Sequence, residues 1–221
     1  MSRLSPQSLR LIALLAVLVL VIGFFASQVD NYFNARLFNR ISSSVAIMAL
    51  IACAQTLVII TRNIDLSIGS VVGFTAFAAG LMVAAHPQMY GLILALYAMG
   101  VGAIFGVING LLVAYARVPS IIVTLATMAI FRSTLVEFSG AQSITTANLP
   151  SWLTDFPNTT LFTIAGLEFR AAFVLAVVVV LIVHVALMRL RPARQLYAVG
   201  SNPEAAEMAG IKRPLVIFCA F

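Results

Sequence analysis

The sequence predicts an all-α, polytopic bundle of transmembrane helices, with about six complete spans and the start of a seventh. Two observations predict this fold class. Hydrophobic residues make up 62% of the chain and charged residues only 9%, whereas about a quarter of the residues in a soluble domain are charged. The apolar residues also form long runs that are apolar on every side, as in helices surrounded by lipid, and the mean hydropathy is +1.08. We therefore expect residues 1–221 to form one transmembrane domain, with no part that folds as a soluble unit.

Six apolar runs approach the roughly 20 residues that a helix needs to cross a bilayer. They cover residues 11–26, 44–60, 66–85, 91–116, 119–136 and 171–188. The first run is longer than the ~7–15 apolar residues of a cleaved signal peptide, and no A-x-A cleavage site follows it. It is therefore expected to be a retained helix. Another apolar run begins at Pro214 and continues to Phe221.

Charged residues predict the orientation of these helices in the membrane. With the N-terminus inside the cell, the cytoplasmic side receives Arg3, Arg10, Arg62, Arg117, Arg189, Arg191, Arg194, Lys212 and Arg213. The outer side receives Arg36, Arg40 and Arg170, together with Asp30, Glu137, Asp155 and Glu168. This bias follows the positive-inside rule and predicts a cytoplasmic N-terminus. The basic residues occur singly at the ends of apolar runs, without interleaved aromatics, so they do not predict binding of nucleic acid.

Two features inside the spans suggest specific roles. Glycines recur at four-residue spacing, at Gly69 and Gly73 in the third span and at Gly102, Gly106 and Gly110 in the fourth. Small residues at this spacing let helix backbones approach closely in lipid, so we expect packing within one subunit, with lining of a pore as the alternative. Arg132 lies inside the fifth span, where an ionisable residue is by default a candidate for function. Because Glu137 follows and the outer end of the span is near, we instead expect Arg132 to snorkel to the outer interface or to form a local ion pair.

A polar interruption, T-R-N-I-D-L-S-I-G-S at residues 61–70, separates the second and third spans. Asp65 and Ser67 are suited to cap the helix that follows, because its N-terminal dipole favours an acidic or hydroxyl side chain there. The interruption is short, so it either turns at the cytoplasmic edge or dips into the bundle. In the second case its polar residues would line a translocation path.

A second polar segment, residues 189–212, contains one short predicted helix at residues 202–210. Asn202 is a favourable N-cap, Pro203 suits the first helical position, Glu204 lies in the first turn, and Gly210 suits a left-handed C-terminal position. About two turns of helix are unstable alone in water. The helix therefore needs a docking surface, either on the membrane helices or on a partner, and we expect Ala205 and Ala206 to lie at or near the surface that docks a partner.

Three stretches resemble one family, the inner-membrane permeases of bacterial ABC importers for monosaccharides such as ribose, arabinose, xylose and rhamnose. Residues 63–70 (NIDLSIGS) are similar to the family's G-G-I-D-L-S-V-G-S. Residues 106–113 and 118–132 are similar to its G-x-x-N-G-x-L-V, P-x-F-I-V-T-L-G-T-M and F-R-G elements, and residues 197–211 to its Y-A-I-G-G-N-x-x-A-A-x-x-x-G-I. The chain departs from the pattern at Arg62-Asn63, where the family has two glycines, and at Ala126, which replaces a glycine.

The resemblance implies a function and a set of partners. The chain would be a permease subunit in the bacterial inner membrane, forming the path for a pentose, hexose or deoxyhexose. It would act with a second permease subunit, identical or related, with cytoplasmic ATPase subunits that bind the helix at 202–210, and with a periplasmic sugar-binding protein. The polar residues of the matching motifs, Asp65, Ser67, Asn109, Thr124 and Thr127, are candidates for the path or for helix capping. Family members have roughly ten helices, so we expect this chain to lack the last several.

Other classes of function are less well supported by the residues. An intramembrane lipid-modifying enzyme would place paired acids or a His/Glu set at one depth, whereas His86 and His184 are isolated. An ion-coupled secondary transporter would be expected to show inverted repeats with intramembrane charges, and no internal repeat is evident. The sequence contains no G-x-x-x-x-G-K-[ST] phosphate-binding loop, and Cys53 and Cys219 belong to no Cys/His cluster. We therefore expect a transporter subunit without catalytic residues, cofactor or metal.

Overall fold

The computed structural model describes residues 6–221, with side-chain surroundings from Ser8 onward, so Arg3 lies outside the described residues. Six long helices dominate it: α1 (Pro6–Gln28), α2 (Ala35–Ile60), α3 (Ile68–Ala85), α4 (Gly91–Gly110), α5 (Ser120–Ser139) and α7 (Ala171–Arg189). All six are long and apolar enough to cross a membrane, α4 together with the π-helical turn η1 (Leu111–Tyr115) that continues it. The predicted all-α, polytopic fold with six spans is confirmed.

Short elements occupy the two long connections. On the expected outer side lie the 3-10 turn η2 (Thr146–Asn148), α6 (Ser151–Asp155), the 3-10 turn η3 (Phe156–Asn158), and the strands β1 (Thr160–Ile164) and β2 (Leu167–Arg170). The strands form an antiparallel hairpin in which Ile164 pairs with Leu167. The two residues between the strands, Ala165 and Gly166, both have positive φ, as a tight hairpin turn requires. The hairpin was not predicted from the sequence, because alanine is unusual at a position with positive φ such as Ala165.

Three helices follow α7: α8 (Arg191–Ser201), α9 (Pro203–Met208) and α10 (Arg213–Phe218). The sequence predicted α9 and the apolar run that begins α10, but not α8. Helix α8 is amphipathic, with Ala193 and Val199 buried and Arg191 and Arg194 exposed. It therefore lies along the end of the bundle and is not a transmembrane span.

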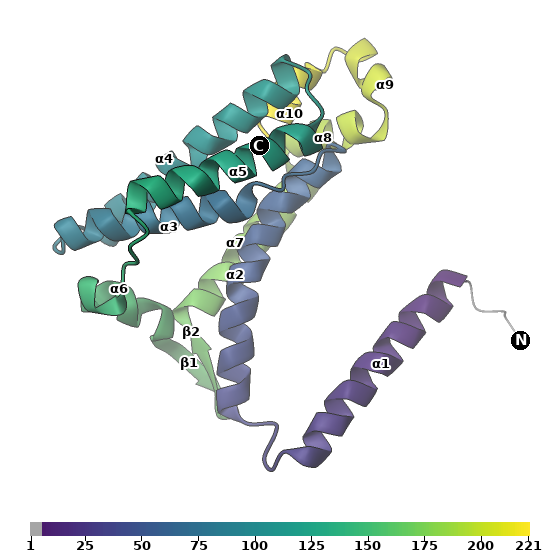
Figure 1. Cartoon of the computed structure of the whole chain (residues 1–221). Helices are drawn as coiled ribbons and strands as arrows, with labels where there is room; N and C mark the ends of the chain where they lie inside the picture. The colour runs from purple at the N-terminus through teal and green to yellow at the C-terminus, as the bar shows by residue number, and fades with distance from the viewer. Residues whose placement is uncertain (1–5) are drawn as a thin grey trace, which may run out of the picture.

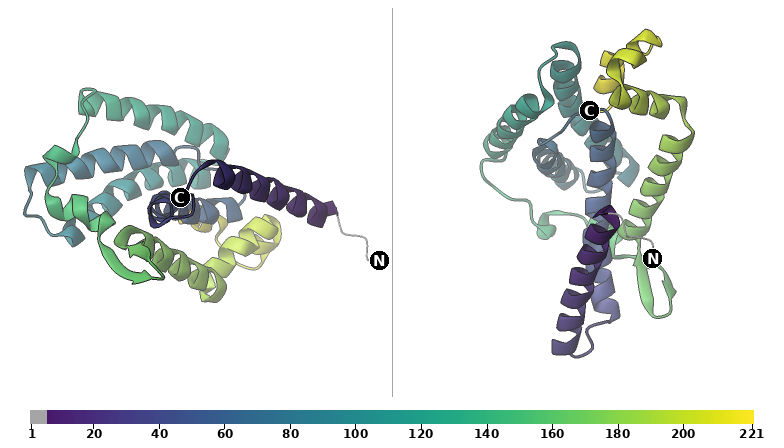
Figure 2. Two further views of the ribbon diagram at one scale, coloured as in Figure 1. Left: turned by 90° about the horizontal axis from the view of Figure 1, so that it is seen from below. Right: turned by 90° about the vertical axis from the view of Figure 1, so that its right-hand side faces the viewer.

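The long helices form two groups. Helix α2 packs along α7, while α3 packs against both α4 and α5. Helix α10 contacts η1, α4 and α8, and so joins the two groups at one end. Helix α1 extends away from the other helices in Figure 1, although it overlaps α2 in projection in the right-hand view of Figure 2, and its side chains are almost all exposed. Exposed apolar helix faces are expected where lipid or another subunit, rather than this chain, surrounds a helix.

The two ends of the bundle differ in construction. Helices α8, α9 and α10 gather where α2 and η1 end, while the β-hairpin lies at the start of α2 and α7 (Figure 1). The α8–α10 end contains the main buried apolar cluster, which consists of Val113, Ala114, Val123, Val199, Ala206, Val216 and Ile217. The short helices are therefore stabilised by burial against the membrane helices, which agrees with the expectation that they cannot be stable alone.

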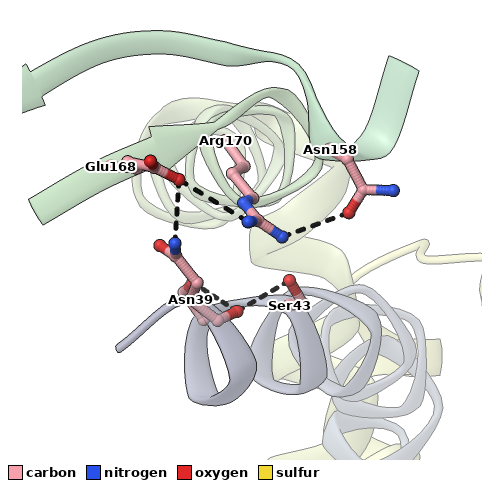
Figure 3. Close-up of polar contacts among 6 residues, drawn as sticks. Asn39, Ser43, Asn158, Glu168 and Arg170 are labelled. Atoms are coloured by element: carbon pink, nitrogen blue, oxygen red, sulfur yellow. Dashed lines mark hydrogen bonds and ion pairs between the residues drawn. The ribbon is translucent and has the colours of Figure 1, made fainter. Parts of the chain in front are cut away.

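A polar cluster ties the hairpin to α2 at the opposite end (Figure 3). Asn39 donates to Glu168 at 2.9 Å, and Arg170 forms an ion pair with Glu168 at 3.5 Å and donates to Asn158 at 3.1 Å. Phe169 lies edge-on to Phe38 of α2 beside this cluster. These contacts hold β2, α2 and η3 together at the expected outer surface.

Candidate functional site

The loop between α2 and α3 folds back against the bundle instead of extending from its edge. Arg62 adopts a left-handed conformation with φ of 62°, which costs a non-glycine residue about 1–2 kcal/mol. The resembled family has glycine here, which adopts this conformation freely. In this chain the arginine offsets part of the strain, because its Nη2 donates to the carbonyl oxygen of Ser201 at 2.7 Å and so ties the loop to α8.

A chain of hydrogen bonds crosses from this loop to α4. Ser67 is fully buried and donates its hydroxyl to Asp65 Oδ1 at 2.6 Å, and the Ser67 backbone N–H donates to the same oxygen at 2.8 Å. Asn109, which is 1% exposed, donates from Nδ2 to Ser67 Oγ at 2.7 Å. Three of the five path or capping candidates are thus joined directly. This burial within a transmembrane bundle is costly for polar groups unless they are paired.

The start of α5 holds the other side of the loop. Ser120 Oγ accepts from the backbone N–H of Ile64 at 3.1 Å, and Thr124 donates to the backbone oxygens of Ile64 at 3.2 Å and Ser120 at 2.8 Å. Thr127 is buried but bonds only within its own helix, to the oxygen of Thr124 at 3.4 Å. Thr124 therefore positions the loop, whereas Thr127 lies outside the connected network.

The capping expected of Ser67 is corrected by this geometry. Ser67 occupies the N-cap position of α3, but its side chain makes no hydrogen bond to the backbone N–H groups of that helix. Its hydroxyl donates to Asp65, and its Oγ accepts from Asn109 Nδ2 instead of from a backbone N–H of α3. Asp65 accepts from Ser67, which precedes the first helical residue, so Asp65 orders the loop before the helix begins.

A cavity of about 170 Å³ adjoins this network; we call it the α2–α4 cavity. Polar groups on its wall come from Gln55, Asp65 and Asn109, and the remaining wall is formed by Ala54, Val58, Ile68, Val71, Gly102, Gly106, Ala220 and Phe221. Gln55 was not among the residues predicted for the site. An amide within the apolar run at 44–60 was the signal that could have identified it.

The predicted packing glycines have different surroundings. A Cβ on Gly106 would lie 2.5 Å from the carbonyl oxygen of Phe221, and one on Gly110 would lie 2.9 Å from the Phe218 ring. A Cβ on Gly73 would make only ordinary contact with Leu135, and one on Gly69 or Gly102 would meet no atom within 4 Å. Close helix approach thus applies to Gly106 and Gly110 against α10 and the residues that follow it. At Gly69 and Gly102 close packing within the chain is contradicted, because no neighbouring helix reaches these positions.

Gly200, which was not among the predicted packing glycines, also lies where two backbones meet. A Cβ on Gly200 would overlap the carbonyl oxygen of Ile60, the last residue of α2. Because that oxygen belongs to a helix end, it cannot rotate aside as a side chain would. Gly200 therefore allows α8 to cross the end of α2.

Helix α9 has the predicted local signals. The Asn202 side chain accepts from the N–H of Ala205 at 3.1 Å, Pro203 is the first helical residue, and Glu204 lies in the first turn. Gly210 follows the C-cap with φ of 81°. Five of the six residues proposed to contact an ATPase, namely Asn202, Pro203, Glu204, Ala205 and Gly210, are at least partly exposed.

The expectation that Ala206 faces a partner is wrong. Ala206 is 4% exposed and packs into the apolar cluster with Val199 and Val216 of this same chain. A short helix must bury one face to be stable, and Ala206 is on that buried face of α9. The outward face instead presents Met208, which is 85% exposed.

Beside α9 lies a second cavity of about 560 Å³ at the α8–α10 end. Its charged lining residues are Arg62, Arg117, Arg213 and Glu207, and Arg213 pairs with Glu207 at 3.7 Å. Arg117 has φ of 57° in the turn between η1 and α5. The surface next to α9 is therefore predominantly basic.

Arg132 is exposed on α5. Within residues 6–221 the ion pairs are Arg170–Glu168 and Arg213–Glu207, so the predicted alternative of an Arg132–Glu137 pair is contradicted. Snorkelling of Arg132 remains a prediction. No group of three metal-ligating side chains occurs in the described part of the chain.

A family model described as a branched-chain amino acid transport system permease component matches residues 37–221, which contain the loop, the cavity and α9. The chain belongs to this permease family. The predicted membership of a transport family, rather than a family of enzymes, is confirmed.

Curated relatives agree with this assignment. The chain is 35% identical over 213 residues to the autoinducer 2 import system permease protein LsrC of Yersinia enterocolitica, and 33% identical over 212 residues to that of Yersinia pseudotuberculosis. The alignments cover 95% of this chain but 55% and 57% of the relatives, so the chain spans little more than half of their length. No solved structure matches.

Proposed function

We propose that this chain forms part of the membrane permease of an ATP-driven importer that carries a monosaccharide, whether pentose, hexose or deoxyhexose, across the bacterial inner membrane. The observation that carries the proposal is the capped, outward-facing helix α9, which the family match includes and which packs against α8 and α10 at one end of the bundle. A helix so anchored can transmit movement from a cytoplasmic protein to the bundle. The import systems named for the relatives support the cargo as a small solute.

The orientation proposed is N-terminus inside. The α8–α10 end carries Arg189, Arg191, Arg194, Lys212 and Arg213 with the acids Glu204 and Glu207, whereas the end with the hairpin carries Arg36, Arg40 and Arg170 with the acids Asp155 and Glu168. Under the positive-inside rule the first end is cytoplasmic. Helix α9 then faces the compartment that contains ATP, and the hairpin with α6 faces the periplasm.

Three kinds of partner follow from this arrangement. Cytoplasmic ATPase subunits would dock on α9 and supply the hydrolysis for which this sequence has no phosphate-binding loop. A second permease subunit, identical or related, would cover part of the apolar helix surface left exposed by this chain. A periplasmic sugar-binding protein would contact the connection formed by α6 and the hairpin and deliver the cargo there.

Uptake of radiolabelled sugars by cells tests the proposal. The complete permease would be expressed with its ATPase and binding protein, and uptake of pentoses, hexoses and deoxyhexoses would be compared with uptake of leucine. We expect uptake of one sugar that is lost when the phosphate-binding lysine of the ATPase is replaced. Uptake that persists in that variant would support an ion-coupled transporter instead, and uptake of leucine alone would refute the sugar assignment.

A surface variant tests the contact with the ATPase separately. Met208→Asp places a charge on the exposed face of α9, where a large apolar side chain is suited to fill a groove on a partner. We expect normal membrane insertion but loss of ATPase co-purification. The matched control is Phe156→Asp on the proposed periplasmic side, also an exposed apolar residue outside the spans. Equal co-purification of both variants would refute α9 as the docking element.

A further inference from the structure

Among the amide oxygens of the described residues that are buried without a hydrogen-bond partner, two belong to side chains that line the α2–α4 cavity. They are Asn109 Oδ1 and Gln55 Oε1. Asn109 is 1% exposed, so the oxygen cannot be solvated from the surface of the chain. Buried polar atoms are nearly always paired with protein, water or a ligand. The cavity therefore presents two acceptors that require donors from an occupant.

The orientation of both amides is determined by neighbours that can only accept or have already donated. The Asp65 carboxylate accepts from the Ser67 hydroxyl, so Ser67 Oγ can only accept from Asn109, and the nitrogen of Asn109 must face it. The nitrogen of Gln55 faces the backbone oxygen of Asp65 at 3.1 Å, and that oxygen also only accepts. If either amide were turned over, its carbonyl oxygen would face another acceptor, which is Ser67 Oγ for Asn109 and the backbone oxygen of Asp65 for Gln55. The carbonyl oxygens are thus held toward the cavity.

The position and size of the cavity favour a solute over a single water. Gln55 lies five residues before the end of α2, about 8 Å inside the cytoplasmic end of the span at 1.5 Å per residue. The volume of about 170 Å³ is more than ten times the ~10–15 Å³ that one water needs. Unpaired acceptors at this depth are costly, so their retention calls for an occupant that pairs with them.

The chemistry of the wall favours a hydroxyl-bearing molecule over a metal cation. Ca²⁺ and Mg²⁺ need about six or more oxygen ligands. The cavity offers fewer: the two unpaired amide oxygens and Asp65 Oδ2, since Asp65 Oδ1 already accepts two hydrogen bonds. Most of the remaining wall is apolar, from residues such as Val58, Ile68 and Phe221. A sugar matches this combination, since its hydroxyls donate along one edge while its C–H surface contacts apolar side chains.

We propose that the α2–α4 cavity is a binding station for a small polyhydroxylated solute, whose hydroxyls donate to Gln55 Oε1 and Asn109 Oδ1. This assignment rests on the proposed function, since it places one step of the sugar path in the cytoplasmic half of the membrane between α2 and α4. It also gives a role to Gly102, where a Cβ meets no atom within 4 Å. The absence of a side chain at Gly102 leaves the cavity open.

The test uses the complete permease in nanodiscs and saturation-transfer NMR with D-ribose, D-xylose and L-rhamnose as probes. Gln55→Leu replaces one free acceptor by an apolar side chain of similar size, and Gly102→Val fills the cavity from its wall. Gly100→Val is the control, since Gly100 is on the same helix, has open space around its Cβ and does not line the cavity. We expect the first two variants to weaken binding of one sugar at least about fivefold, as loss of a hydrogen bond does, and Gly100→Val to bind as the wild type.

Several outcomes would overturn the proposal. Unchanged sugar binding in Gln55→Leu and Gly102→Val would show that water or another part of the complete permease pairs with the amides. A rise in thermal stability with NaCl over choline chloride, present in the wild type and lost in Gln55→Leu, would identify a cation as the occupant. Sugar uptake that depends on the ATPase but is insensitive to both variants would refute the cavity and leave the proposed function intact. Sugar binding in the cavity without ATPase-dependent uptake would refute the function alone.

Discussion

The sharpest stability prediction concerns the crossing of α8 over the end of α2. Replacing Gly200 with alanine adds one methyl group, which would overlap the carbonyl oxygen of Ile60 and lie 3.0 Å from its carbonyl carbon. Both atoms are backbone, so relief requires α8 to move away from α2. That movement would loosen the bond between Arg62 and the oxygen of Ser201, which is adjacent to Gly200.

Two opposing effects set the magnitude. In a helix without steric conflict, alanine is favoured over glycine by up to about 1 kcal/mol. Overpacking a close contact costs about 1–3 kcal/mol. We therefore expect Gly200→Ala to lower the free energy of unfolding by about 1–2 kcal/mol net, whereas Gly100→Ala, where a Cβ meets no atom within 4 Å, leaves it unchanged or raises it slightly.

Thermal unfolding in detergent, followed by thiol labelling, measures this difference. In a Cys219→Ser background, Cys53 within α2 is the remaining thiol and reports when the helix bundle opens. A loss of 1–2 kcal/mol corresponds to a fall in Tm of about 2–8 °C for a chain of this size. Equal Tm values for Gly200→Ala and Gly100→Ala would show that α8 does not press against the end of α2.

Three further outcomes follow from the same geometry. Gly106→Leu should destabilise the chain by about 1–3 kcal/mol, because its Cβ alone would reach within 2.5 Å of the Phe221 oxygen; unchanged thermal stability would place Gly106 toward lipid. Ala206→Trp should lower Tm as well as ATPase binding, since Ala206 is buried in the chain's own core; loss of ATPase binding at a normal Tm would reinstate it as a surface residue. Cysteines introduced singly near Thr159 and Asn202 in a cysteine-free chain should differ in whole cells, with an impermeant reagent labelling only the first, and the reverse pattern would invert the topology.

Much of the site could be recognised from residue types, but its connections could not. Asp65, Ser67 and Asn109 were recognisable as polar residues in apolar surroundings, and the structure joins them through bonds of 2.6 and 2.7 Å. Gln55 was missed, although it completes the polar wall of the cavity. Nothing in the local pattern indicates that α2, α3 and α4 bring residues 55, 65 and 109 to one place, because such proximity depends on helix packing.

Helix α9 also has features that the sequence predicts and features that it does not. Its boundaries could be predicted from Asn202, Pro203 and Gly210, because caps and left-handed positions act through neighbouring backbone. The direction in which each side chain points could not, so Ala206 was placed on the wrong face. A helix of two turns has no long apolar stripe, and which face is buried depends on the surface against which it docks.

The sequence by itself determined the all-α class, the six spans, the capping of α9 and the membership in a transport family, because each depends on composition, local backbone preference or motif spacing. Only the tertiary structure decided the close approach of Gly200 to the end of α2, the burial of Ala206 and the convergence of Gln55, Asp65 and Asn109 on one cavity. The physical reason is that hydropathy and capping act along the chain. Contacts between helices depend on the rotation of each helix about its axis and on its depth in the membrane. In helices that are apolar on every side, the sequence pattern specifies neither.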